Sequence, residues 1–324
     1  MLLAIADDFA RGEKTETVVT WDERLGLFPL SNIDARVVSS PAEEQALFRQ
    51  LVQWADATLV IAPELDAALT ERRRQVDALG GRYLGPDLDA IRLCSDKLAT
   101  CQWLEQNNFP TVPTHALSME GPPPPPEAFP VVLKRRDGAG SQGMQLVSNE
   151  TEWTLALQDA SQTGPLDRLV WQPFISGRSV SCLVLIAMDR SQLEVFPPAD
   201  QRLTEDRRFS YQGGRLPAEL FDATRGVIIQ TARRVCEDLS GLRGFVGFDW
   251  IVPESEPAHP LIVDVNPRLT TSYIGYRALA RENLARRLLA DSSQWETIRW
   301  GDSIVAFRPD GTVAVTRPPQ REEQ

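Results

Sequence analysis

The chain has 324 residues and is acidic, since 34 Lys and Arg against 45 Asp and Glu give a net charge of −11 and a pI near 4.9. This charge argues against nucleic acid or an anionic membrane surface as the main partner. The length predicts two or more domains, and 42% hydrophobic with 24% charged residues is the balance of a soluble globular protein.

Cysteine and hydropathy patterns exclude further classes. The cysteines, Cys94, Cys101, Cys182 and Cys236, form no CxxC pair and lie far from both histidines, so neither a zinc site nor a disulfide framework is expected. No apolar run reaches the roughly 18 residues of a membrane span. Residues 1–8 contain no basic residue and end in Asp7 and Asp8, which is typical of a first strand and not of a signal peptide. We therefore expect a cytoplasmic protein with reduced thiols.

The first unit, residues 1 to about 92, alternates strand and helix patterns. Strands are expected at 2–6, 36–39 and 58–62, and helices at 42–55 and from about 65 to 79. The alternation predicts a doubly wound α/β sheet. The first strand–helix turn, residues 6–12, is not GxGxxG, so we predict no dinucleotide site there.

Two further units and a tail follow. In the second unit, 93–175, we expect helices at 95–106 and 150–159, and strands at 129–134, 144–147 and 169–175. The proline run 122–126 must be extended, and we interpret it as a connecting loop, with a ligand for an SH3 or WW domain as the alternative. In the third unit, 176–316, we expect strands at 180–188, 193–196, 245–252 and 261–265, helices at 218–239 and 276–290, and a final hairpin over 304–315. Residues 317–324 have the composition of a tail.

A lysine followed by glycines marks the most distinctive loop of the second unit. Lys134 ends a strand, and the loop after it contains Gly138, Ala139, Gly140, Ser141 and Gly143. Small residues let backbone N–H groups close over a phosphate without obstruction by Cβ atoms. Since the spacing fits neither a P-loop nor the dinucleotide fingerprint, the pattern predicts either a flap over a nucleotide or a hairpin with a wide turn.

Oxygen-bearing side chains stand in two strands of the third unit. Asp249, Asp264 and Asn266 offer only hard oxygen ligands, which favours Mg²⁺ over zinc and leaves Mn²⁺ as an alternative. Asp264 and Asn266 are two residues apart, so both project from one face of a strand. Arg268 follows, where a guanidinium can clamp phosphate or carboxylate oxygens. A buried hairpin with polar ends is the alternative interpretation.

Two segments near the unit boundaries add candidates. Residues 171–177 join the second unit to the third, and such a hinge can offer backbone groups to an adenine edge, with Phe174 and Ile175 against its face. A core strand with a turn is the alternative. Lys97 stands near a helix N-terminus, where a cation is unfavourable to the macrodipole. This hints at a ligand, and a surface lysine is the alternative.

Taken in order, these motifs resemble the ATP-grasp superfamily of carboxylate–amine ligases. They are the stretches 95–97, 109–114, 132–134 with the glycine loop, the hinge at Gln172, 248–249 and 264–268. The resemblance covers essentially the whole chain. It implies an α/β protein with an ATP-grasp fold and an N-terminal doubly wound pre-ATP-grasp domain.

The resemblance also implies a role for each candidate. Lys97 and Lys134 would hold nucleotide phosphates, and the glycine loop would be the flap. Adenine would lie at the hinge residues Gln172, Phe174 and Ile175. The Mg²⁺ ligands would be Asp249, Asp264 and Asn266, and Arg268 would steady an acyl phosphate. Residues of the following segment would bind substrate, namely Thr270, Thr271 and Ser272.

The chain departs from the superfamily pattern at three positions. Asp264 stands where the second metal carboxylate is usually glutamate, and Gln172 stands where the hinge usually opens with glutamate. The glutamate that commonly holds the ribose is absent, with Arg178 and Ser179 near its place. The metal site is therefore expected to persist, and the ribose contact is the feature put in doubt.

Within the superfamily the chain most resembles the tyramine–glutamate ligases of methanofuran-type cofactor biosynthesis. The segments that suggest this are 62–64, 84–85, 209–214 and 266–272, together with Gln201. The resemblance implies small-molecule carboxylate and amine substrates, ATP and Mg²⁺, and an amide product. The alternatives are an ATP-grasp enzyme that acts on other amino acids or phosphorylates another acceptor, and a module that binds ATP without turnover. A homodimer through an apolar face over 227–235 and the N-terminal unit is a further expectation.

Overall fold

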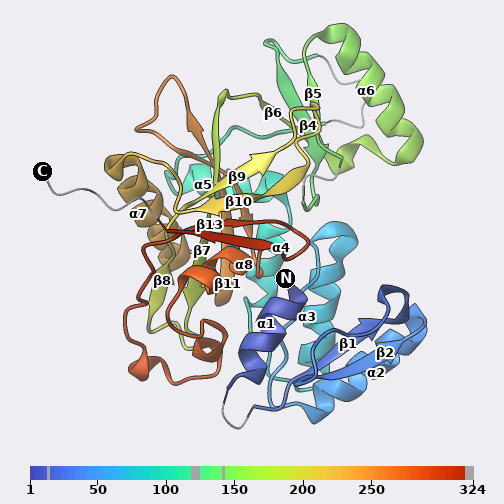
Figure 1. Cartoon of the computed structure of the whole chain (residues 1–324). Coiled ribbons are helices and arrows are strands. Elements are labelled where there is room, and N and C mark those ends of the chain that lie inside the picture. Colours follow the sequence, from blue (N-terminus) through green and yellow to red (C-terminus); the bar gives the residue numbers. More distant parts are fainter. Residues whose placement is uncertain (13–14, 118–124, 141–142, 318–324) are drawn as a thin grey trace, which may run out of the picture.

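The computed structural model describes residues 1–12, 15–117, 125–140 and 143–317, which form three α/β units (Figure 1). A small N-terminal unit packs against the part that carries a large antiparallel sheet, and a four-stranded sheet with one long helix stands beyond that sheet. None of the helices within these ranges is long and apolar enough to cross a membrane.

The N-terminal unit contains three helices, one parallel strand pair and two 3-10 turns. These are α1 (Leu2–Ala10), β1 (Val18–Asp22), β2 (Asp34–Val38), α2 (Pro41–Trp54) and α3 (Ala68–Ala78), with the turns at Glu23–Leu25 and Leu65–Ala67. β1 pairs with β2 in parallel register. Ser40 caps α2 by accepting from the Glu43 N–H, while the Glu43 carboxylate accepts from the Ser39 N–H. This capping arrangement explains where α2 begins.

Two strands expected in this unit are absent from the described residues. Residues 2–6 are part of helix α1, because Ile5 and Ala6 are buried at adjacent positions while Leu2 and Phe9 pack beside them at helical spacing. Residues 58–62 make a single parallel bridge, between Thr58 and Tyr83. The described part of the unit therefore contains a two-stranded parallel sheet instead of the longer one expected from the sequence.

The second unit is an antiparallel sheet in the order β3-β6-β4-β5, covered by one helix. Its elements, with two preceding helices, are α4 (Leu88–Cys94), α5 (Lys97–Gln106), β3 (His115–Ala116), β4 (Val131–Arg135), β5 (Gln145–Val147), α6 (Glu150–Thr163), a 3-10 turn (Leu166–Arg168) and β6 (Leu169–Pro173). Asp96 caps α5 by accepting from the Leu98 and Ala99 N–H groups. This cap fixes Lys97 as the first helical residue.

The third unit carries an eight-stranded antiparallel sheet in the order β12-β11-β7-β9-β10-β13-β14, with β8 paired to β7. Its elements are β7 (Gly177–Ile186), β8 (Leu193–Val195), β9 (Ala199–Leu203), β10 (Tyr211–Leu216), α7 (Asp222–Asp238), β11 (Gly244–Pro253), β12 (Leu261–Asn266), α8 (Tyr273–Leu279), 3-10 turns at Ala285–Leu288 and Ser292–Gln294, β13 (Ile304–Phe307) and β14 (Val313–Thr316). The helix expected over 276–290 is wrong in extent, because Ala280 turns extended and bridges Trp300.

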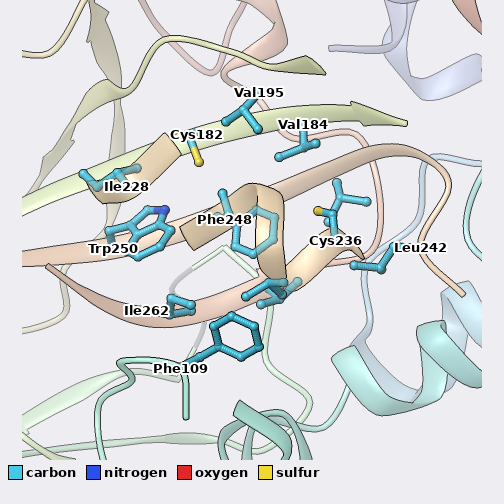
Figure 2. Packing of buried hydrophobic residues seen from close by; sticks show 14 of the residues in the cluster. Phe109, Cys182, Val184, Val195, Ile228, Cys236, Leu242, Phe248, Trp250 and Ile262 are labelled. Atoms are coloured by element: carbon cyan, nitrogen blue, oxygen red, sulfur yellow. The ribbon is translucent and has the colours of Figure 1, made fainter. Parts of the chain in front are cut away.

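The two faces of the large sheet have different roles. On one face, Cys182, Phe248 and Trp250 pack with buried residues of helix α7 (Figure 2). Since side chains alternate along a strand, Ser181 and Asp249 point to the opposite face. That face is apolar where it meets α8 and polar where it meets the second unit, which places a candidate site between the two.

The segment expected to face a second copy packs inward. Ile228, Ala232 and Val235 of α7 are fully buried in the core beneath the sheet, while Val227 is partly exposed. Helix α7 therefore offers no continuous apolar face, and the homodimer stays a prediction.

Candidate functional site

A cavity of about 260 Å³ lies between the four-stranded sheet and the polar face of the large sheet. Most of the predicted site residues line it: Lys97, Lys134, Gly138, Gly140, Gln172, Phe174, Ile175, Asp249, Asp264, Asn266, Arg268, Thr270, Thr271 and Ser272. Ala139 and Gly143 belong to the same loop but are not among the described residues that line the cavity. Ser141 lies outside the described residues.

Two carboxylates face each other at the base of the cavity. Asp249 of β11 and Asp264 of β12 are paired in antiparallel register, which brings their Cβ atoms to roughly 5 Å on one face of the sheet. Asp249 accepts hydrogen bonds from Gln201 Nε2 at 2.7 Å and Asn266 Nδ2 at 2.9 Å. Burial, and then the repulsion of Asp264, raises the pKa of Asp249. A divalent cation between the two carboxylates would remove that repulsion.

The donor set fits magnesium. Among the described residues, no group of three or more His, Cys, Asp and Glu that could hold a metal ion is found, so a metal at this carboxylate pair would use the Asn266 amide as a third ligand. Because Asn266 gives its Nδ2 to Asp249, its Oδ1 is the atom left to act as a ligand. If two carboxylates and an amide oxygen bound Mg²⁺, its remaining coordination positions would be open to phosphate oxygens and water. Mg²⁺ beside a nucleotide usually has such a mixed set of ligands.

Lys97 lies beside this carboxylate pair. Its Nζ forms an ion pair with Asp264 Oδ2. Burial would lower the pKa of Lys97, but the negative charges of Asp264, Glu64 and Asp249 outweigh this and raise it. Lys97 is therefore a fixed positive charge next to the candidate metal ligands. Sequence reasoning left open a surface lysine, and the structure rejects that alternative.

Lys134 is the second cation of the cavity and has a different environment. Its side chain is 3% exposed, and within the described residues its ammonium has no hydrogen-bond or ion-pair partner. Burial and the nearby Lys97 lower the pKa of Lys134 to about 8. A buried ammonium without a partner is expensive, so an anionic ligand would stabilise it.

The hinge segment is held by contacts that the sequence did not reveal. Gln172 is buried and donates from Nε2 to Thr114 Oγ1 at 2.8 Å, so its amide is used within the protein. Phe174 stacks on Phe209, with ring centroids 6.1 Å apart, and both rings line the cavity. Phe209 comes from the loop between β9 and β10, two strands that were not expected because their polar and glycine-rich sequences lack the alternation of a buried strand.

The start of the glycine loop is tied to the N-terminal unit. Arg135 donates to Asp137 and, at 3.0 Å, to Asp66, whose carboxylate also accepts from Arg168 at 2.9 Å. The Asp66 N–H donates to Asp137 Oδ2 at 2.9 Å. A turn of the first unit therefore contacts the loop that we expect to close over phosphates.

Arg268 meets the same turn. Its guanidinium forms two hydrogen bonds with the Glu64 carboxylate, Nε to Oε1 at 2.9 Å and Nη2 to Oε2 at 3.0 Å. Nη1 donates to the Leu269 carbonyl at 3.3 Å. This planar fork fixes the orientation of the guanidinium. The sequence suggested Glu64 only through its place after a predicted strand.

The segment after Arg268 closes one end of the cavity. Thr270 Oγ1 and Ser272 Oγ lie 2.9 Å apart and share a hydrogen bond. Thr270 packs directly on Gly247, where a Cβ atom would lie 2.2 Å from the Thr270 methyl group. The two hydroxyls and Thr271 thus present a small polar wall beside Arg268.

Comparison with known proteins identifies the fold family. Residues 94–272 match the family described as "ATP-grasp domain", and residues 15–91 match the "pre ATP-grasp 3 domain". The chain belongs to the ATP-grasp family. The ATP-grasp fold and its N-terminal pre-ATP-grasp domain, expected from the order of the motifs, are therefore confirmed.

Individual ATP-grasp relatives are distant. The D-alanine–D-alanine ligase of Thermotoga petrophila is 30% identical over 186 residues, which is 54% of this chain and only 58% of that protein. The tyramine–L-glutamate ligase of Methanocaldococcus fervens is 23% identical over 241 residues, 74% of this chain and 67% of that protein. The biotin carboxylase domain of Hydrogenobacter thermophilus 2-oxoglutarate carboxylase, solved as a dimer with MgADP, ADP and bicarbonate, has a TM-score of 0.75 at 17% identity, covering 94% of this chain and 72% of that one. This last likeness concerns the ATP-grasp fold alone.

Proposed function

We propose that the protein is an ATP-dependent carboxylate–amine ligase that forms an amide through an acyl phosphate and releases ADP and phosphate. The observation that carries the proposal is the gathering of two lysines, two aspartates and an arginine around one cavity in an ATP-grasp fold. The residues are Lys97, Lys134, Asp249, Asp264 and Arg268. Phosphoryl transfer requires cations on the transferring group and asks little covalent chemistry of the protein.

Each group in the cavity has a task in this reaction. Lys134, buried and without a partner among the described residues, binds phosphate oxygens. Mg²⁺ held by Asp249, Asp264 and Asn266 would supply charge neutralisation on the nucleotide. The hinge with Phe174 and Phe209 holds the base by apolar contact. Arg268 places two oxygens of the acyl phosphate, and exclusion of water from the cavity during the reaction would protect it from hydrolysis.

The substrates that we propose are L-glutamate and tyramine or a related amine. The support is the likeness to the tyramine–L-glutamate ligase over most of this chain. The likeness to a D-alanine–D-alanine ligase favours a second candidate, in which the amine is that of another amino acid. In both cases a carboxylate is activated and an amine attacks it, so the cavity chemistry is shared.

The proposal is tested by measuring ADP release with Mg-ATP across a grid of acids and amines, with mass spectrometry of the product. The expected result is an amide formed with one ADP per bond. ADP with a stable phosphorylated product would replace the ligase by a kinase-like reaction. ATP binding without ADP release from any pair would contradict an enzymatic role and favour the binding module.

A further inference from the structure

The turn at 64–67 of the pre-ATP-grasp unit contacts both sides of the cavity without lining it. Glu64 binds Arg268, which lies beyond β12, and Asp66 contacts Arg135 at the start of the glycine loop. Asp66 and Ala67 have φ values of 49° and 60°, a left-handed conformation that is uncommon for alanine and more readily adopted by aspartate. Such uncommon conformations are concentrated where backbone placement matters for function.

The Glu64–Arg268 contact is a buried bidentate pair. The Glu64 residue is 5% exposed, and the Arg268 side chain is 13% exposed. Glu64 is not among the described residues that line the cavity, whereas Arg268 is. Glu64 therefore touches no ligand in the cavity itself, and its hydrogen bonds to the cavity lining go to Arg268.

The contact with Glu64 leaves only some of the Arg268 N–H groups free. An arginine carries about five N–H donors in a fixed fork. Two of them bind Glu64 and a third binds the Leu269 carbonyl. One N–H on each terminal nitrogen is left, and the fork with Glu64 fixes the plane in which these two donors lie. Two donors held in one plane can bind two oxygens of a phosphate group.

We propose that Glu64 is a positioning residue, contributed by the pre-ATP-grasp domain, that orients the free N–H groups of Arg268 toward the phosphate formed from the nucleotide. The inference rests on the ligase activity proposed above and names a residue outside the cavity on which that activity depends. The pre-ATP-grasp domain thereby takes part in the reaction and does more than cover the ATP-grasp domain.

The test measures the affinity of inorganic phosphate, a product of the proposed reaction, for the Mg-ADP complex of the full chain by calorimetry. Glu64→Gln should weaken phosphate binding roughly tenfold, since it removes the charge and one acceptor of the fork, and should leave Mg-ADP affinity unchanged. Glu64→Asp keeps the charge, so we expect the fold to be retained. Its side chain is one methylene shorter and would draw the guanidinium back, so we expect phosphate binding to weaken here as well. Glu44→Gln, which breaks the Arg72 ion pair in the same unit, is the matched control and should change neither affinity.

A double-mutant cycle separates positioning from a general structural role. Arg268→Lys should weaken phosphate binding, and adding Glu64→Gln to it should cause no further loss, because Glu64 acts through Arg268. Wild-type phosphate affinity in both Glu64 variants would overturn the inference, as would a full additional loss in the double variant. Absence of phosphate binding by the wild type would overturn the role of Arg268 itself. Phosphate binding as expected, but with no amide from any acid–amine pair, would count against the proposed function and leave this inference standing.

Discussion

Lys97 and Asp264, which are 167 residues apart in sequence, form an ion pair in which both side chains are largely buried. The pair joins the first residue of α5 to strand β12. One member is assigned to a nucleotide phosphate and the other to a metal ion. A phosphate is negative and would pair with Lys97, and a metal ion is positive and would pair with Asp264. Binding of Mg-ATP can therefore replace the ion pair without leaving either side chain unpaired.

Replacing Asp264 by Asn should therefore remove the negative charge from a candidate metal ligand and from the partner of Lys97 together. We expect turnover to fall by at least roughly a hundredfold, because charge on the transferring phosphate would lose its counter-ion. Steady-state ADP release measures this, and urea unfolding checks that the variant is folded. Asp310→Asn in the turn between β13 and β14 is a distant control. Near-normal turnover by Asp264→Asn would refute the metal assignment.

The pKa of Lys134 gives a pH-dependent prediction. In the ligand-free protein burial lowers this pKa from 10.5 to about 8, so the ammonium loses its proton as pH rises past about 8. A bound triphosphate favours the charged form, so binding takes up a proton above that pH. ATP affinity should then fall by up to about tenfold per pH unit above pH 8. Calorimetry should show the fall, and Lys134→Met should bind more weakly at pH 7 with a flat profile. A wild-type profile that stays flat to pH 10 would contradict the assignment.

Phe209 should contribute to base binding through its stack with Phe174. Phe209→Ala removes one wall of the cavity, and we expect ATP affinity to weaken roughly tenfold while kcat changes little. Fluorescence titration with ATP and steady-state kinetics would measure the two effects. Phe221→Ala, at a ring that is 77% exposed, is the control. An unchanged ATP affinity for Phe209→Ala would remove Phe209 from the base site.

Replacing Asp8 of α1 should lower the stability of the fold without changing ligand binding. Its carboxylate accepts from Tyr273 Oη at 2.6 Å and from Arg277 Nε at 2.9 Å. Asp8→Ala should lower the free energy of unfolding by about 3 kcal/mol, at the lower end for a broken buried pair because Asp7 still contacts Arg277. Urea unfolding measures this. Asp34→Ala, in an exposed pair with Arg36, should cost less than about 1 kcal/mol. If Asp8→Ala and Asp34→Ala lowered the free energy of unfolding equally, the buried contacts of Asp8 would contribute little to stability.

Much of the site was predictable from local patterns. Asp264 and Asn266 share a face because a strand has period two, and Lys134 lies at a strand end beside glycines, so their chemistry is visible in a short window of sequence. Phe209 and Gln201 were not assigned to the cavity from the sequence, because β9 and β10 are polar and glycine-containing and acquire their place only by pairing with β7 and β13. The Lys97–Asp264 contact depends on tertiary packing and leaves no local signal.

The N-terminal unit was the least predictable part of the fold. Residues 2–6 are short and uniformly apolar, and such a run fits a buried strand or a buried helix equally well. The helical form is stabilised by packing of α1 on α8, where Asp8 contacts Tyr273 and Arg277. Glu64 illustrates the same limit at the site, because its partner Arg268 is 204 residues away.

The central claim is that a carboxylate is activated as an acyl phosphate in this cavity. The most direct measurement uses an acid labelled with ¹⁸O in its carboxylate, for the pair that gives amide in the ADP-release grid, and mass spectrometry of the inorganic phosphate. Attack of the carboxylate on the nucleotide, followed by attack of the amine on the acyl carbon, transfers one labelled oxygen to each phosphate. We predict one ¹⁸O in phosphate per amide formed. Unlabelled phosphate accompanying amide formation would contradict the acyl phosphate and the roles proposed for Arg268 and Glu64.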